Sequence, residues 1–132
     1  MRIADKKEEI EAYFAELSDI IPSDFDEYKN DLKTKAACER YFEKIIEAVI
    51  DLAFFIIKEK KLKLPEEDKR AFDILCEGKI IPAQLAEKLK DAKGMRNLIA
   101  HKYGDVDDKM VFHSIAEELE RDVREFMKKV EK

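Results

Sequence analysis

Residues 45–57 of the chain read "IIEAVIDLAFFII", and this stretch decides the fold. Eleven of its thirteen residues are apolar, and the two exceptions are Glu47 and Asp51. On an α-helix that turns about 100° per residue, the apolar side chains cover almost the whole circumference and leave a narrow polar strip around the two carboxylates. The stretch is shorter than the roughly 20 apolar residues that a membrane-spanning helix needs. It therefore predicts a helix buried by other protein segments, and no membrane span.

Two arrangements would bury such a helix: it runs through the centre of a bundle, or a second copy of the chain packs against it. Few other helices fit into 132 residues to surround it, which favours a symmetric homodimer. In that case a charged substitution such as Val49→Glu should give monomers or insoluble protein. Asp51 has two interpretations, a solvated member of the polar strip or a buried acid that orients an active-site group. Because polar strips are common on helices, the solvated interpretation is favoured.

Apolar residues at helical spacing continue on both sides of this stretch. Pro22 ends a first helix, Ser23 is placed to cap the next segment, and Gly104 follows the helix before the last. Pro65 and Pro82 stand where a first helical position tolerates proline. The predicted helices cover residues 3–21, 23–62 with a break near Asn30, 66–77, 82–101 and 107–130. The sequence therefore predicts an all-α fold, a compact up-and-down bundle of about four to five helices in a single domain, residues 1–132.

The composition excludes several classes of protein. Cys38 and Cys76 are too few for a disulfide framework, and no Cys or His cluster has metal-ligand spacing, so we expect no metal site and no cofactor. The N-terminus is charged throughout and lacks the apolar core of a signal peptide. We therefore expect a cytoplasmic protein.

The charge is unevenly distributed along the chain. The net charge of −5 argues against indiscriminate binding of nucleic acid. Residues 88–102, however, hold five basic residues against Asp91 alone, a local charge of +4. We call residues 88–102 the basic segment. It is either a solvated lysine face or a surface that binds an anion.

Within and just beyond the basic segment, residues 93–105 read "KGMRNLIAHKYGD". His101 can move protons near neutral pH, Arg96 can hold a phosphate, and Tyr103 offers a phenolic oxygen, so these residue types suit phosphodiester chemistry. On an ideal helix Arg96 and Tyr103 share a face, whereas Arg96 and His101 point about 140° apart. Convergence would need unwinding near Gly104, or long side chains that meet at a groove between two subunits. The alternative is an exposed arginine and a histidine near the helix end, with no reactive role.

The string "GMRNLIAHKY", residues 94–103, resembles the G-[FM]-R-N-x-x-x-H-x-Y signature of the HEPN superfamily, specifically its HepT-like group. The resemblance extends over nearly the whole chain. "CERYFEKIIEAVIDLA" is similar to the long central helix of the group, "LPEEDKRAFDILCEGKIIP" to its short third helix and turn, and "DVDDKMVFHSIAEELERDVREFM" to its last helix.

The resemblance implies a helical bundle that dimerises with its R-x4-6-H motifs facing each other in a cleft. HepT-like proteins are metal-independent endoribonuclease toxins, usually encoded beside a minimal nucleotidyltransferase antitoxin, as in type VII toxin–antitoxin systems. Arg96 and His101 would then be catalytic, and the antitoxin would adenylylate Tyr103. Beside them we predict four further site residues: Asn97 and Asp51 in support, and Lys93 and Lys102 in contact with RNA.

Two other functions are compatible with the sequence. A non-catalytic module could bind a nucleotide or a nucleotidyltransferase and present Tyr103 to it, with Arg96 clamping a phosphate. A purely structural helical dimer would give no phenotype on substitution of either motif residue. Toxicity on expression that is lost in Arg96→Ala would favour the nuclease. We expect His113 to be structural under every one of these interpretations.

Overall fold

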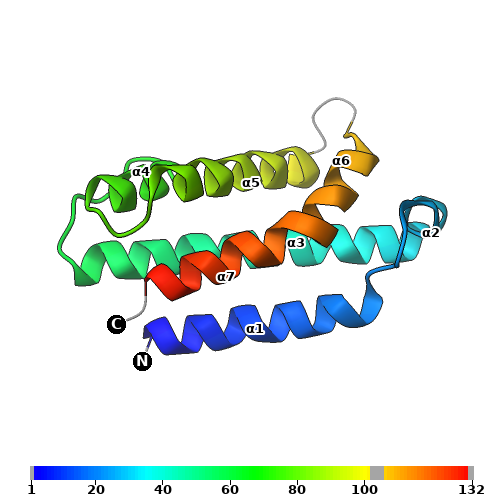
Figure 1. The fold of residues 1–132 in the computed structure, drawn as a ribbon, viewed down its shortest axis with the longest axis horizontal. Coiled ribbons are helices and arrows are strands. Elements are labelled where there is room, and N and C mark those ends of the chain that lie inside the picture. Colours follow the sequence, from blue (N-terminus) through cyan, green and yellow to red (C-terminus); the bar gives the residue numbers. More distant parts are fainter. Residues whose placement is uncertain (1, 102–105, 131–132) are drawn as a thin grey trace.

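The computed structural model of the protein describes residues 2–101 and 106–130, where every regular element is a helix (Figure 1). The elements are α1 (Arg2–Ile20), α2 (Phe25–Asn30), α3 (Leu32–Glu59), α4 (Arg70–Glu77), α5 (Ala83–His101), α6 (Asp108–His113), the π-helical η1 (Ser114–Glu118) and α7 (Leu119–Lys129). Figure 1 shows α1, α3, α5 and the final run from α6 to α7 alternating in direction, so the all-α, up-and-down architecture is confirmed. No helix in the described ranges is long and apolar enough to cross a membrane.

The predicted count of four to five helices is wrong. Because α6, η1 and α7 are continuous, the described residues form six helical segments, and the additional one is α2. Asp31 separates α2 from α3 in an extended conformation, and its carboxylate accepts a hydrogen bond from the Thr34 backbone N–H at 3.2 Å. It therefore caps α3, and the predicted break near Asn30 is confirmed. The cap of α2 is not Ser23 but Asp24, which accepts from the Glu27 N–H at 2.9 Å.

The two later prolines differ in what they do. Pro82 directly precedes α5, and its carbonyl accepts a hydrogen bond from the Ala86 N–H at 3.1 Å, as expected for the start of a helix. Pro65 does not open α4. The residues after it form a turn in which the Arg70 N–H donates to the Glu67 carbonyl at 3.0 Å, and α4 begins only at Arg70.

Lysines terminate α3 and α4 where glycine is usual. Lys61 has φ 60° and donates its N–H to the Lys58 carbonyl at 3.1 Å, while the Leu62 N–H donates to the Ile57 carbonyl at 2.9 Å. This pair of hydrogen bonds is the Schellman motif, whose left-handed position normally carries glycine. Lys79, with φ 64°, ends α4 in the same way. Both helices thus stop at a strained backbone position.

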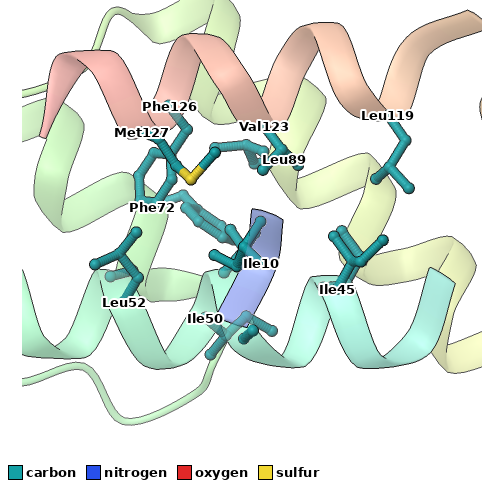
Figure 2. Packing of buried hydrophobic residues seen from close by; sticks show 14 of the residues in the cluster. Ile10, Ile45, Ile50, Leu52, Phe72, Leu89, Leu119, Val123, Phe126 and Met127 are labelled. Carbon is teal, nitrogen blue, oxygen red and sulfur yellow. The ribbon is translucent and has the colours of Figure 1, made fainter. Parts of the chain in front are cut away.

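The core is centred on α3, which contacts α1, α2, α4 and α5. Figure 2 shows apolar side chains from α1, α3, α4, α5 and α7 meeting in this core: Ile10, Ile45, Ile50, Leu52, Phe72, Leu89, Leu119, Val123, Phe126 and Met127. Nine of the eleven apolar residues of stretch 45–57 are buried within the single chain, and Phe54 and Phe55 are half-buried. The chain's own helices therefore cover this stretch. Of the two predicted arrangements, the structure has the one in which α3 runs through the centre of the bundle, so burial of this stretch no longer argues for a second copy. The homodimer itself stays a prediction.

Candidate active site

Polar side chains of α5 and α3 form a connected network at the predicted motif. The Arg96 Nη2 lies 2.5 Å from Glu47 Oε2 of α3, and its Nη1 donates to Asn97 Oδ1 at 3.2 Å. Lys93 Nζ donates to the same amide oxygen at 3.0 Å. We call these four residues, Glu47, Lys93, Arg96 and Asn97, the Arg96 cluster. Within it, Asn97 accepts hydrogen bonds from both cations, and the Glu47 carboxylate is bound to Arg96.

The sequence of α5 explains how this cluster forms. Arg96 follows Leu85 by eleven residues and Leu89 by seven, spacings that place it on the buried face of the helix. Its side chain is only 22% exposed and extends along α5 towards α3. Glu47 occupies the polar strip of α3 and meets the guanidinium there. A cation in the packed interface of two helices is stable because a carboxylate and an amide accept its hydrogen bonds.

The hydrogen bond from Arg96 to Asn97 links the arginine to the ridge of α5 that ends at His101. Lys93, Asn97 and His101 follow one another at intervals of four residues, so they lie along one ridge of α5. Because Arg96 bonds to Asn97, its guanidinium lies beside this ridge, one turn before His101. The helix is continuous to His101, so unwinding before that residue plays no part. The structure thus brings Arg96 together with Asn97 and Glu47, and it places His101 one helical turn after Asn97.

The protein constrains all three nitrogens of the Arg96 guanidinium. Its Nε is buried and has no hydrogen-bond partner among the described residues. Nη1 and Nη2 each give one hydrogen bond to the cluster. Since each Nη carries two hydrogens, each keeps one donor that its hydrogen bond to the cluster does not use, whereas the buried Nε offers none to a ligand.

His101 is exposed and is the last residue of α5. An exposed imidazole at a helix end can be approached by a substrate, as proton transfer requires. Lys102, Tyr103 and Gly104 lie outside the described residues, so their predicted roles stay predictions.

The two carboxylates of the polar strip have different partners. Asp51 has a side chain that is 57% exposed and pairs with Lys6 of α1 at 3.3 Å. The structure thus places Asp51 on the solvated side of the strip, next to α1, and its predicted supporting role at the motif stays a prediction. Glu47, one turn earlier, contacts the motif instead. The strip itself was visible in the sequence, but the pattern gives no sign of which of its two acids faces α5.

The basic segment is more strongly neutralised than its composition suggests. Lys93 is only 9% exposed and is held by Asn97, so it does not belong to a solvated lysine face. Lys90 pairs with Asp73 at 3.0 Å and with Glu87 at 3.3 Å. Burial argues against direct phosphate contact by Lys93, and its predicted contact with RNA stays a prediction. In the parts of the chain that the structure describes, no three His, Cys, Asp or Glu residues are grouped to hold a metal ion.

Comparison with protein families identifies the family to which the chain belongs. The family model described as "Ribonuclease HepT-like" matches residues 10–130, which is most of the chain. This chain belongs to the HepT-like ribonuclease family. The resemblance inferred from the motif is therefore confirmed.

Individual HepT-like proteins give the same result. The chain is 27% identical over 97 residues to the mRNA nuclease HepT of Shewanella oneidensis, an alignment that spans 74% of this chain and 73% of that protein. It is 34% identical over 86 residues to a putative RNase of Archaeoglobus fulgidus, which covers 65% of this chain and 64% of the relative. A solved structure of the tri-AMPylated Shewanella oneidensis HEPN toxin in complex with MNT antitoxin has a TM-score of 0.91 at 24% identity, over 98% of this chain and 96% of that one. At this identity the structural match establishes the HEPN-like fold.

Proposed function

We propose that this protein is the endoribonuclease toxin of a toxin–antitoxin pair whose antitoxin is a minimal nucleotidyltransferase. Membership of the HepT-like family supports the reaction class, and a relative is named an mRNA nuclease. The solved complex of a similar HEPN toxin with its MNT antitoxin supports the partner class. The observation that carries the proposal is the Arg96 cluster, which holds a guanidinium with open donors beside the ridge that ends at His101.

The chemistry follows from these two side chains. His101 takes the proton of an RNA 2′-hydroxyl, and the 2′-oxygen attacks the adjacent phosphorus as the bond from phosphorus to the 5′-oxygen breaks. A second proton donor gives its proton to the leaving 5′-oxygen. Arg96 stabilises the negative charge that develops on the phosphoryl oxygens, so no metal is required.

One motif histidine cannot serve as base and acid in the same step. We therefore propose a homodimer in which the His101 side chains of two copies share the proton transfers. This proposal rests on the reaction and on the family resemblance, since the apolar surface of α3 gives no support for a dimer. Light scattering that shows a monomeric wild-type protein at micromolar concentration would contradict it.

Cleavage of single-stranded RNA in excess chelator tests the function. Wild-type protein should cleave the RNA. Arg96→Ala removes the charge stabilisation and His101→Ala removes the proton transfer, so each variant should lose at least about 100-fold in kcat. His113→Ala is the matched control, because His113 is the other histidine of the chain and its imidazole is exposed near Glu118 on the final helical run. Activity that survives His101→Ala, or that disappears with chelator, would rule out this mechanism.

Control of the toxin is proposed to act through Tyr103. In this step the phenolic oxygen of Tyr103 attacks the α-phosphorus of ATP, AMP is transferred and pyrophosphate leaves. The added phosphodiester carries a negative charge two residues from His101, where it would compete with RNA for Arg96. Co-expression with the cognate nucleotidyltransferase should add one or more AMP units to Tyr103 and stop RNA cleavage, as intact-mass measurement and peptide mapping would show. Tyr103→Phe should remain active under the same conditions; an AMP adduct elsewhere in a silenced protein would contradict this assignment.

A non-catalytic nucleotide-binding or nucleotidyltransferase-binding module is the second candidate. The observation that favours it is the neutralisation of the basic segment, in which Lys90 is ion-paired and Lys93 is buried. Expression of the chain alone separates the two candidates. Toxicity that is lost in Arg96→Ala supports the nuclease, and growth that is unaffected by the wild-type chain supports the binding module.

A further inference from the structure

Glu47 is the member of the Arg96 cluster that does not come from α5. It comes from α3, forty-nine residues before Arg96 in the sequence, and its side chain is 42% exposed. Because Glu47 is partly exposed, solvent screens part of its attraction to Arg96, which limits what the pair adds to stability. The pair also fixes one end of the guanidinium, and this second effect concerns function.

The geometry points to a positioning role. We infer that Glu47 holds the Arg96 guanidinium in the orientation that the reaction needs, an inference that rests on the proposed ribonuclease function. Glu47 holds Nη2 and Asn97 holds Nη1, so two separated hydrogen bonds fix the plane of the group. Because Nε is buried, a phosphate would be received by the hydrogens of Nη1 and Nη2 that these two bonds do not use. Glu47 is thus a positioning residue, which acts on substrate only through Arg96.

The charges of the Arg96 cluster predict how alignment of Arg96 by Glu47 can be told apart from an effect of Glu47 on RNA binding. Lys93 and Arg96 are cations and Glu47 is an anion, so the four residues together carry one positive charge. Removal of Glu47 raises this charge by one, which should strengthen the attraction of RNA. The same removal releases one end of the guanidinium and costs its alignment with the phosphate. Loss of Glu47 should therefore lower kcat while KM stays the same or falls.

Two substitutions at position 47 and one control test the inference. Glu47→Ala should lower kcat by about 10- to 100-fold without raising KM, because misalignment by about 1 Å is sufficient for such a loss. Glu47→Gln keeps an oxygen acceptor for Nη2 and should recover most of the wild-type kcat. Glu59→Ala removes an exposed carboxylate from the last position of the same helix and should leave kcat unchanged. A Glu47→Ala enzyme with unchanged or higher kcat, or a Glu47→Gln enzyme as slow as Glu47→Ala, would overturn the positioning role.

A second readout does not depend on cleavage. In the His101→Ala background, which removes the proposed base, the side-chain NMR signals of ¹⁵N-labelled Arg96 report how firmly its guanidinium is held. Restricted rotation and slow hydrogen exchange are expected with Glu47 present and should be lost in Glu47→Ala. Identical Arg96 signals in both proteins would refute the inference. An inactive wild-type enzyme would refute the proposed function but leave this measurement decisive for the role of Glu47.

Discussion

Helices α3 and α5 pack against each other but bury different kinds of side chain. All eleven buried residues of α3 are apolar, and they lie on nearly every side of the helix. α5 buries only five residues, and one of them is Lys93. Arg96 also lies on the inner face of α5, where Glu47 and Asn97 accept its hydrogen bonds. The helix that holds the core together is therefore not the helix that carries the motif.

Because of this difference, we expect α3 to contribute mainly to stability and the polar residues of α5 mainly to activity. α3 supplies eleven of the 31 buried apolar residues that the structure describes, and each fully buried aliphatic or aromatic side chain contributes about 1.5–3 kcal/mol to folding. The polar contacts of α5 contribute much less per residue, because hydrogen bonds to water are exchanged for hydrogen bonds within the protein. Substitutions on α3 should therefore change stability, and substitutions in the Arg96 cluster should mainly change activity.

Val49→Glu should give the largest effect. Val49 is fully buried in the single chain, so the substitution places a carboxylate in the core without a partner. The cost should exceed about 4 kcal/mol, a large part of the 5–15 kcal/mol that stabilises a typical domain. We expect an insoluble or unfolded protein, detected by the loss of helical circular dichroism.

Leu32→Glu is the matched control for this substitution on the same helix. Leu32 is 75% exposed in the first turn of α3, where a negative charge also suits the helix dipole, so stability should stay within about 0.5 kcal/mol of wild type. A Val49→Glu protein that is folded and monomeric, beside a dimeric wild type, would show that α3 faces a second copy after all.

Asn97→Ala tests whether a residue of the Arg96 cluster contributes to stability as well as to activity. Asn97 is the acceptor for both Lys93 and Arg96, and its loss leaves the buried Lys93 ammonium without this hydrogen bond. We expect a loss of about 1–3 kcal/mol in the free energy of unfolding, measured by urea titration, together with a lower kcat. Asn97→Asp keeps an oxygen at the same place and adds a charge that favours both cations, so it should be at least as stable as wild type. Equal urea midpoints for Asn97→Ala and wild type would mean that the network contributes only to activity.

The sequence was informative where a pattern repeats and uninformative where one neighbour must be chosen over another. Helical periodicity and Pro22 or Pro82 located α1, α3, α5 and the final run, because burial of one face requires that spacing. The same periodicity does not say what covers an apolar helix, which is why stretch 45–57 suggested a second copy. It also does not say which of Glu47 and Asp51 faces α5, since both lie on one strip. Tertiary packing alone decides both questions.

The end of α3, predicted near residue 62 and observed at Glu59, was hard to predict for a local reason, whereas the predicted end of α4 at residue 77 is confirmed. Sequence rules look for glycine at a left-handed position, but here Lys61 and Lys79 occupy it. The side chain of Lys61, for example, carries no signal that distinguishes it from Lys60 beside it. The helix ends are therefore set by the hydrogen bonds of the following residues, Leu62 and Ile80, to carbonyls of the preceding turn.

Lys61→Gly should give the smallest effect and act on α3 alone. Lys61 has φ 60°, a conformation that costs an L-residue about 1–2 kcal/mol and glycine almost nothing. Part of that gain is offset because glycine has more freedom in the unfolded chain, so we expect a net stabilisation of about 0.5–1 kcal/mol, seen as a higher urea midpoint. Lys60→Gly removes a lysine from the neighbouring position, whose φ of −83° and ψ of −1° suit any residue, and it should be neutral or destabilising. Because α5 and the Arg96 cluster are untouched, kcat should be unchanged in both variants. Equal midpoints for the two glycine variants would show that the left-handed lysine is not strained, and a change in kcat would show that the end of α3 is coupled to the site on α5.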